Sequence, residues 1–236
     1  MIVVNIGNTH LRWLAFEGEQ IVDSGRVPTR EAVLQPPTLP PGPVALVSVV
    51  PGCRAALLPV WTAEGRSVFD VNGAVDLGLV LAYTEKQRLG ADRLANAVAL
   101  WHGFGPGIVV DAGTATTLTV VDETGVLRGG AIMPGLTTAR DSLWQGTAQL
   151  PAVSLEIPEK SVGESTEAGL RAGLVLGHIG AVLFLIQRMR QEVPSARTLI
   201  VTGGWGALLS AELPAAQYVA DLTLLGARWA WLNANK

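Results

Sequence analysis

Two segments of the 236-residue sequence share an arrangement of residues that suits the binding of phosphate groups. Each has a run of β-branched apolar residues, then Asn or Asp, a spacer residue, Gly, and residues that carry hydroxyl groups. The first is IVVNIGNT at residues 2–9, and the second is IVVDAGTATT at residues 108–117. Glycine has no Cβ, so the backbone can approach a ligand closely there, and backbone N–H groups and Thr hydroxyls can donate hydrogen bonds to phosphate oxygens. The repeat therefore predicts two related phosphate-binding turns, one in each half of the chain.

A third segment, Gly90-Ala91-Asp92-Arg93, places a carboxylate beside a cation at the start of a predicted helix. One interpretation is structural: Asp92 caps the helix, and Arg93 is a solvated residue of its first turn. The other is catalytic: Asp92 acts as a general base, and Arg93 anchors a carboxylate through a bidentate pair. Tyr83, upstream of this segment, could line the same pocket. From the residues alone, both interpretations stay open.

Two glycine-rich segments are further candidates for contact with a ligand. Gly129–Gly135 has glycines on both sides of a short apolar segment. It is alternatively a strand between two turns. Gly203 and Gly204 follow a predicted strand, where a purine or ribose can lie against bare backbone.

The elements that position these residues are predicted from the hydrophobic pattern. The expected strands are residues 2–4, 11–16, 44–50, 67–69, 108–111, 117–122 and 199–201, and the expected helices are residues 54–61, 92–101, 136–146, 166–190 and 222–233. In each half the hairpin comes first and helices follow, which favours an α/β fold with two similar lobes. The glycines of residues 103–107 mark the boundary, so we expect lobes at residues 1–104 and 105–236.

Composition limits the class of protein. No uninterrupted apolar run approaches the roughly 18–20 residues of a membrane span, and the N-terminus lacks the features of a signal peptide. The formal charge of −3 argues against a nucleic-acid-binding protein, which usually has a basic face. The single cysteine, Cys53, cannot form an internal disulfide, which fits a reducing compartment. We therefore expect a cytoplasmic protein with neither a membrane nor a nucleic-acid partner.

Large aromatic residues on the predicted helices point to an assembly. They are more than one modest core should need, so we expect a homodimer. The residues concerned are Trp101, Trp144, Trp229 and Trp231.

Taken in order, these segments resemble the type III pantothenate kinases, members of the acetate and sugar kinase/Hsp70/actin superfamily. The resemblance extends over most of the chain, and seven ordered matches are far more specific than any one. The matching segments are Asn5–Thr9, Ser48–Pro51, Tyr83 with Gly90–Arg93, Asp111–Thr117, Gly129–Gly135, Thr166 at the head of a helix, and Leu222–Gly226.

The resemblance implies two ribonuclease H-like lobes of the actin-like ATPase fold, with the nucleotide cleft between them. It implies ATP-dependent phosphorylation of pantothenate to 4'-phosphopantothenate, the first step of coenzyme A biosynthesis, with Asp92 as the base. A homodimer, Mg²⁺ that arrives with ATP and a monovalent cation, K⁺ or NH4⁺, are also implied. The implied pantothenate-binding residues are Tyr83, Gly90, Ala91, Arg93 and Thr166, the nucleotide-binding residues are Asn5, Gly7, Asn8, Thr9, Gly113, Thr114, Thr116, Thr117, Gly203 and Gly204, and the metal-binding residues are Asp111 and Asn5.

One residue departs from the family pattern. The family carries Asp where this chain has Asn5, and an amide supplies an oxygen without the negative charge that magnesium favours. Three explanations are open: a natural variant that tolerates Asn, an engineered substitution, or a homologue without kinase activity. The alternative function is a non-catalytic nucleotide- or pantothenate-binding regulatory protein on the same fold. A kinase for another small hydroxylated acid is a third reading.

Overall fold

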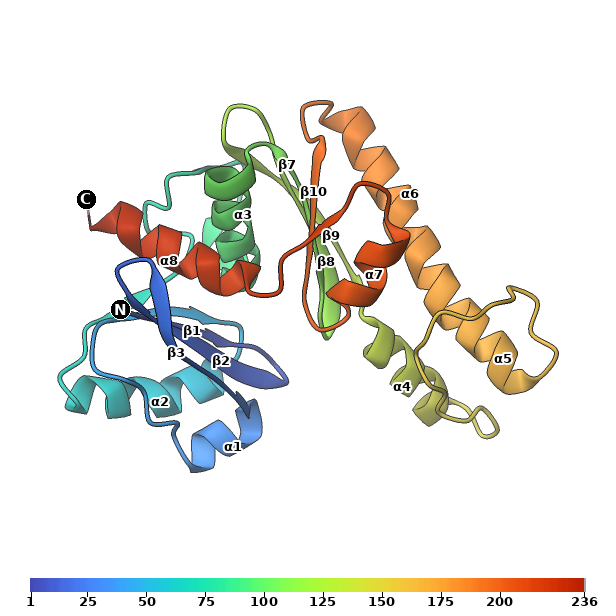
Figure 1. Cartoon of the computed structure of the whole chain (residues 1–236), viewed down its shortest axis with the longest axis horizontal. Coiled ribbons are helices and arrows are strands. Elements are labelled where there is room, and N and C mark those ends of the chain that lie inside the picture. Colours follow the sequence, from blue (N-terminus) through green and yellow to red (C-terminus); the bar gives the residue numbers. More distant parts are fainter. Residues whose placement is uncertain (236) are drawn as a thin grey trace. The chain divides into compact units, whose positions relative to one another are not determined.

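The computed structural model describes residues 1–235, which form two compact α/β units (Figure 1). Unit 1 contains Met1–Phe104, Gly125–Leu127 and the segment from Asp221 onward, and unit 2 contains Gly105–Thr124 and Arg128–Ala220. The first boundary falls where the glycine-rich segment placed it. The C-terminal segment, however, packs with unit 1, whereas the sequence analysis assigned it to the second lobe.

Close packing of two helices explains why the C-terminal segment belongs to unit 1. Helix α8 (Leu222–Ala234) lies against α3 (Ala91–Phe104). A Cβ at Gly226 of α8 would come within 1.9 Å of the carbonyl oxygen of Ala95 in α3, so only glycine allows this approach. Leu222, Leu224 and Ala227 are buried along the same helix.

The sheet of unit 1 has the strand order β3-β2-β1-β4-β5. Its strands are β1 (Ile2–Ile6), β2 (His10–Glu17), β3 (Gln20–Pro28), β4 (Val44–Ser48) and β5 (Val68–Asp70). Strand β1 is antiparallel to β2 and parallel to β4, so the strand expected at residues 44–50 lies inside the sheet. Unit 1 also contains α1 (Thr29–Leu34), α2 (Pro51–Ala63), β6 (Val80–Leu81) and a 3-10 helix, η1 (Lys86–Arg88). Pro51 begins α2, where proline is favoured because its missing N–H has no partner to lose.

Unit 2 repeats the same strand order. Across its sheet the strands lie in the order β9 (Val126–Pro134), β8 (Ala115–Val121), β7 (Gly107–Ala112), β10 (Thr198–Thr202) and β11 (Gln217–Tyr218). Strand β7 is antiparallel to β8 and parallel to β10, as β1 is to β2 and β4. The first residues of β9 pair with β6 and are counted with unit 1. The repeated order confirms the predicted α/β fold with two similar lobes.

The helices of unit 2 are α4 (Leu136–Gly146), α5 (Thr166–Arg171), a π-helical turn η2 (Ala172–Leu176), α6 (Gly177–Glu192) and α7 (Gly206–Glu212). Helix α4 has the predicted bounds. The predicted helix 166–190 is the continuous run α5-η2-α6, and Val175, Ile179 and Val182 of this run pack against Ile108 and Leu118 of the sheet.

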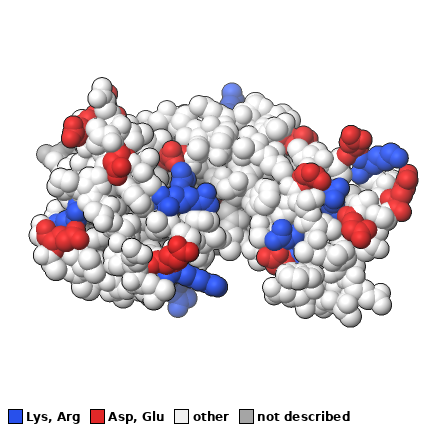
Figure 2. All heavy atoms as spheres, turned by 60° about the horizontal axis from the view of Figure 1, so that its bottom comes forward, with Lys and Arg blue, Asp and Glu red and all other residues white. Residues whose placement is uncertain are grey.

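The run Thr166–Glu192 is also long and apolar enough to cross a membrane, judged by length and composition alone. Its most apolar window has a mean hydropathy of 1.9, and 33% of that window is buried inside the protein. Core helices of soluble proteins meet the same criteria. On the surface drawn in Figure 2, basic and acidic side chains are interspersed, as the small net charge of −3 suggests.

Candidate active site

The first predicted phosphate-binding turn joins β1 to β2 in unit 1. The Gly7 N–H donates to the carbonyl oxygen of His10 at 3.0 Å, and this bond closes the turn. Thr29 holds the turn from outside: its hydroxyl donates to the Gly7 carbonyl at 2.6 Å, and its N–H donates to the Thr9 carbonyl at 3.0 Å. Thr29 is buried, whereas Asn8 and Thr9 are exposed. Buried Thr29 therefore fixes the backbone of the turn, while Asn8 and Thr9 are exposed to solvent.

Asn5 lies on β1 just before this turn, directly opposite Arg12 of β2. Within residues 1–235 its side-chain oxygen Oδ1 is buried and has no hydrogen-bond partner. A buried acceptor without a partner is costly, so this oxygen suits a ligand that donates a hydrogen bond, such as a metal-bound water. Arg12 is paired with Asp221 at 2.5 Å.

The second predicted turn joins β7 to β8 in unit 2 and is also held by hydrogen bonds. The Gly113 N–H donates to the Ala115 carbonyl at 3.1 Å. The Thr114 carbonyl accepts from the Gly135 N–H at 3.0 Å and from the Thr138 hydroxyl at 2.6 Å. A Cβ at Gly135 would lie 2.1 Å from the Gly113 carbonyl oxygen. The segment Gly129–Gly135 thus ends in a glycine that lets the chain pack directly on the turn.

Asp111 lies at the carboxyl end of β7, the edge of a parallel sheet where ligands usually bind. It is opposite Thr117 of β8 and beside Thr202 of β10. Gly203 has a φ of +91°, and a Cβ there would come within 2.6 Å of Asp111 Oδ1. Gly204 has open space where a side chain would project. The structure therefore brings Asp111, Thr117 and Gly203 together in unit 2.

No group of three or more His, Cys, Asp or Glu side chains in the described part of the chain is placed to hold a metal ion. Magnesium does not require one, because it keeps several waters and is commonly bound by one or two carboxylates and the substrate phosphates. Asp111 supplies a carboxylate and Asn5 an unpartnered oxygen. Each of these residues, taken within its own unit, has an oxygen of the kind that magnesium or its bound water accepts as a partner.

Thr116 has a different setting from the other predicted phosphate ligands. Side chains alternate along a strand, so Thr116 projects to the opposite face from Thr117. That face is covered by α6, and Thr116 is 1% exposed. Its hydroxyl lies 3.0 Å from Nε2 of His178, a residue that the sequence analysis did not single out. The Thr116 side chain therefore supports the turn from the core instead of facing a phosphate.

Asp92 lies in the first turn of α3. The Leu94 N–H donates to the Gly90 carbonyl at 3.1 Å, so Gly90 occupies the cap position and Asp92 is not the N-cap. Asp92 Oδ1 accepts a hydrogen bond from the Arg93 N–H at 2.7 Å. A Cβ at Gly90 would also lie 2.7 Å from this oxygen, which explains the glycine. Burial raises the pKa of the Asp92 carboxyl above its usual value, although the Arg93 N–H and charge oppose the shift.

Arg93 is buried, at 7% exposed, and is not the solvated residue of the structural interpretation. Its Nη2 donates to the Tyr83 hydroxyl at 2.9 Å, and its guanidinium carbon lies 5.7 Å from the centre of the Tyr83 ring. Its Nε is buried and has no hydrogen-bond partner among the described residues. A buried cation with an unused donor favours an anionic ligand.

A cavity of about 470 Å³ borders the start of α3 within unit 1. Gly90 and Ala91 line it. Arg54 and Asp70, which also line it, form a two-point ion pair in which Nε and Oδ1 are 3.1 Å apart. The remaining lining residues are Ser48, Val49, Val71, Asn72, Gln87, Arg88 and Leu89. Sequence reasoning did not find Arg54 and Asp70, because neither stands in a recognisable motif.

Thr166 is the first residue of α5 and is exposed, as expected of a residue at the head of a helix. Ser165 caps this helix by accepting a hydrogen bond from the Ala168 N–H at 3.2 Å. Thr166 belongs to unit 2, whereas Tyr83, Asp92 and Arg93 belong to unit 1.

Solved structures of other proteins have the same fold as this chain. A Baf-family protein from Campylobacter jejuni has a TM-score of 0.66 at 19% identity and covers 100% of both chains. The ethanolamine utilization protein EutJ from Carboxydothermus hydrogenoformans has a TM-score of 0.56 at 15% identity, covering 97% of this chain and 87% of EutJ. At these identities the likeness shows the fold alone. The protein has the α/β fold of these structures, and its two units contain sheets with the same strand order.

Sequence relatives define the family. The family model described as type III pantothenate kinase matches residues 1–188. The type III pantothenate kinase of Methylacidiphilum infernorum is 35% identical over 237 residues, covering 97% of this chain and 86% of the relative. That of Agathobacter rectalis is 30% identical over 256 residues, covering 100% and 98%. This chain belongs to the type III pantothenate kinase family, whose members use ATP to phosphorylate an alcohol group.

Proposed function

We propose that this protein transfers the γ-phosphoryl group of ATP to the 4'-hydroxyl of pantothenate, the first step of coenzyme A biosynthesis. The observation that supports this most strongly is the pair at the start of α3: a carboxylate in a desolvated position beside a buried guanidinium with an unused donor. One group can take a proton and the other can hold a carboxylate. Pantothenate carries both the hydroxyl and the carboxylate that this pair requires.

In the proposed reaction, Asp92 accepts the proton of the substrate hydroxyl while that oxygen bonds to the γ-phosphorus. The bond from the γ-phosphorus to the bridging oxygen breaks, and ADP leaves. Such transfer depends mainly on positioning and on neutralisation of charge. A carboxyl with a raised pKa is a stronger base than an ordinary aspartate.

Pantothenate is held by the residues around Asp92. Arg93 binds its carboxylate, and Tyr83 orients the guanidinium by accepting a hydrogen bond from Nη2. Gly90 and Ala91 line the adjoining cavity, and their bare or small side chains leave room for the substrate. Thr166 completes the set assigned by family resemblance.

The two turns bind the nucleotide. Their backbone N–H groups and exposed hydroxyls face phosphate oxygens, and Gly203 and Gly204 offer bare backbone to the purine or ribose. Asp111 and Asn5 would hold the divalent ion that arrives with ATP, and such an ion would neutralise phosphate charge. By family resemblance, a monovalent cation, K⁺ or NH4⁺, is also used. The residues assigned to phosphates are Gly7, Asn8, Thr9, Gly113, Thr114 and Thr117, with Thr116 as support.

The proposed function is tested by ADP release from ATP, with and without pantothenate and with other small hydroxylated acids. We expect ADP release that depends on pantothenate and exceeds that with the other acids. If another acid gave more ADP release than pantothenate, that acid and not pantothenate would be the substrate. Binding of both ligands without any ADP release would support the non-catalytic alternative, which no structural observation favours.

Replacement of Arg93 by alanine or lysine should weaken pantothenate binding much more than ATP binding. Lysine cannot reproduce a bidentate guanidinium–carboxylate pair, so we expect KM for pantothenate to rise by roughly tenfold or more, a loss typical of a hydrogen bond to a charged group. Pantothenol, which has an alcohol in place of the carboxylate, is the matched control. Arg93→Ala should change its KM little, and an equal loss for pantothenate, pantothenol and ATP would contradict the assignment.

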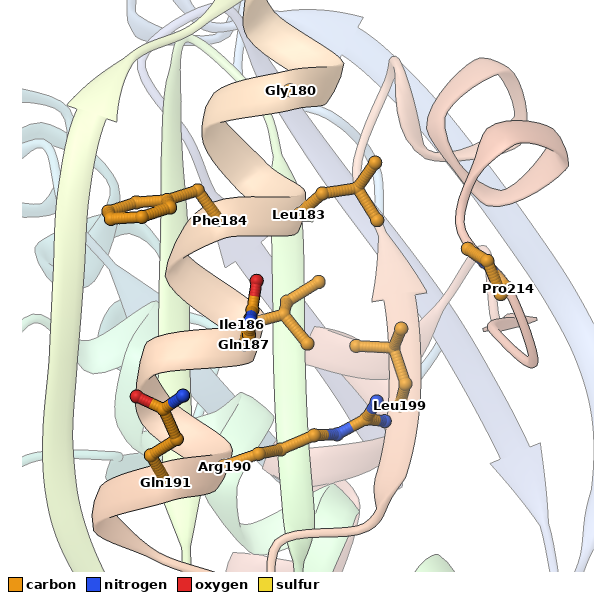
Figure 3. A pocket seen from close by; sticks show the side chains of 9 residues that line it. All are labelled: Gly180, Leu183, Phe184, Ile186, Gln187, Arg190, Gln191, Leu199 and Pro214. Atoms are coloured by element: carbon orange, nitrogen blue, oxygen red, sulfur yellow. The ribbon is translucent and has the colours of Figure 1, made fainter.

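We also propose that the protein is a homodimer joined through unit 2. Several of its elements carry exposed apolar side chains: Ile132 is 65% exposed on β9, Trp144 51% on α4, and Phe184 61% on α6. A shallow cavity of about 690 Å³ lies between α6 and β10. In Figure 3, Leu183 and Ile186 point from α6 toward Leu199 of β10, whereas Phe184 projects from the other side of the helix.

The tryptophans that suggested a dimer have different settings. Trp229 stacks on His102, with ring centroids 5.3 Å apart, and Trp101 packs on Gly125, so both contribute to unit 1. Trp144 is the exposed one. A second copy would cover some of these exposed apolar side chains of unit 2, because apolar surface is commonly buried in interfaces between subunits.

Light scattering of the purified protein should report a dimer. Phe184→Asp should shift it toward monomer, because a charge would be buried at the interface. Leu34→Asp is the matched control, since Leu34 is 86% exposed on α1 of unit 1, and it should leave the dimer intact. A monomeric parent that is fully active would rule out this proposal.

We place the protein in the cytoplasm, where its family's substrates are made and used. The single cysteine, Cys53, is buried and free, and burial raises the pKa of its thiol. It is therefore a weak nucleophile, and its chemistry does not enter the proposed function.

A further inference from the structure

His178 is a buried titratable residue to which the reaction assigns no role. It is the second residue of α6, and α6 follows directly after the π-helical turn Ala172–Leu176. Turns of this type inside α-helices are frequently found at functional sites. His178 is 6% exposed, and its Nε2 lies within hydrogen-bond distance of the hydroxyl of Thr116.

We propose that His178 is a positioning residue for the nucleotide: it holds the 113–117 turn in its phosphate-binding shape through Thr116. The inference rests on the assignment of this turn to phosphate binding.

The position of Thr116 connects His178 to the turn. Thr116 is the second residue of β8 and lies opposite Ala112, the last residue of β7. The turn that carries Thr114 is the short connection between these two positions. A shift of Thr116 therefore moves the backbone N–H groups of the turn. Thr116 Oγ1 and His178 Nε2 are 3.0 Å apart, so the bond ties the turn directly to α6.

The other contacts that hold the turn lie at places different from the Thr116–His178 bond. Gly135 and Thr138 hold the Thr114 carbonyl, and Gly203 packs against Asp111 and Ala112. These contacts fix the turn at its tip and along β7. His178 supplies a polar contact to β8, on the face of the strand that α6 covers.

The buried setting of the imidazole suits it to this task. Burial lowers the pKa of His178 below its usual value, so a neutral ring is favoured in the core. A neutral ring accepts from the Thr116 hydroxyl or donates to it, according to its tautomer. In either case the bond joins two buried polar groups, and a buried polar group is costly when it has no hydrogen-bond partner.

The two roles of such a residue can be separated. A residue that only stabilises the fold lowers the amount of folded protein and leaves the affinity of the folded fraction unchanged. A residue that positions the turn changes nucleotide affinity in protein that is fully folded. Pantothenate affinity should change much less, because Tyr83 and Arg93, which hold its carboxylate, belong to unit 1.

The test is calorimetric titration of the purified protein with a non-hydrolysable ATP analogue and Mg²⁺, which requires no turnover. His178→Leu and Thr116→Val each remove the bond with little change in volume. Each should weaken analogue binding by about 5- to 30-fold, the factor that one or two kcal/mol produces. The double variant should lose no more than either single one, because both remove the same bond.

Conservative variants and a matched histidine serve as controls. Thr116→Ser retains a hydroxyl and should restore most of the affinity. His102→Leu removes a histidine of unit 1 that lies 2.7 Å from Asn233 Nδ2 and stacks on Trp229. It should lower thermal stability without a change in analogue affinity.

The outcomes distinguish this inference from the assignment on which it rests. If the parent protein does not bind the analogue, the assignment of the nucleotide site is wrong. If the parent binds it and folded His178→Leu and Thr116→Val bind it equally well, the site stands and the role of His178 is overturned. Should His178→Leu fail to fold, the Thr116→Val and Thr116→Ser pair decides the same question.

Discussion

Replacement of Asp92 by alanine should reduce pantothenate-dependent ADP release by about 10²- to 10⁴-fold, the usual cost of losing a general base. The physical reason is the setting of the carboxylate. It lies in the first turn of α3, is partly withdrawn from water, and stands beside the buried Arg93. Affinity for pantothenate should change little, because Arg93 and Tyr83 remain. The rate is measured under saturating ATP and pantothenate.

A control carboxylate separates catalysis from helix stability. Glu31 is an exposed acidic residue in the first turn of α1, in the same unit. Glu31→Ala removes a similar interaction with a helix N-terminus and should leave the rate near that of the parent. Near-parental turnover of Asp92→Ala would mean that Asp92 has only a structural role.

The same carboxylate sets the expected pH dependence. Asp92 must be deprotonated to accept a proton, and burial raises its pKa. As the pH falls, the active form should therefore be lost at a higher pH than for an ordinary aspartate. The acidic limb of the kcat profile reports this group.

Replacement of Asn5 by aspartate should raise turnover and lower the magnesium concentration needed for the half-maximal rate. Asn5 Oδ1 is buried without a partner in the described residues, so a carboxylate there would add a charge close to the ion. Two unit charges about 4 Å apart attract by roughly 1 kcal/mol in water and 4 kcal/mol at a protein surface. A gain of at least about fivefold in rate is therefore expected if the ion is that close. KM for pantothenate should barely change.

Arg12 is the main competitor for the new charge, because it lies directly opposite position 5. It is already paired with Asp221, which leaves the new carboxylate available to the ion. Gln20→Glu adds the same charge at an exposed position of β3 and should give no gain. A parent that is fully active, with a neutral or harmful Asn5→Asp, would mean that the turn works with the amide and that Asp111 holds the ion alone.

Local patterns in the sequence predicted the parts of the fold that depend on neighbouring residues. The runs at residues 2–9 and 108–117 became the first strands and turns of two sheets with the same order. Helix α4 begins and ends where its spacing indicated. These features follow from side-chain periodicity and from glycine in turns, which a short window of sequence contains.

The features that were missed depend on contacts between distant segments. Gly226 lets α8 approach Ala95, and this approach moves the C-terminal helix into unit 1. Thr116 was grouped with the phosphate ligands because of its hydroxyl, but strand alternation turns it toward His178. The Arg54–Asp70 pair lines the cavity beside Gly90 without any motif. None of these contacts leaves a periodic signal in the sequence.

Detection of the phosphorylated product tests the central claim most directly. The purified protein is incubated with ATP, Mg²⁺, K⁺ and pantothenate, and the products are followed by phosphorus NMR and mass spectrometry. We predict one phosphorylated pantothenate for each ADP, with the phosphate on the 4'-hydroxyl. ADP formed at the same rate without pantothenate, or no phosphorylated pantothenate although both ligands bind, would contradict the account.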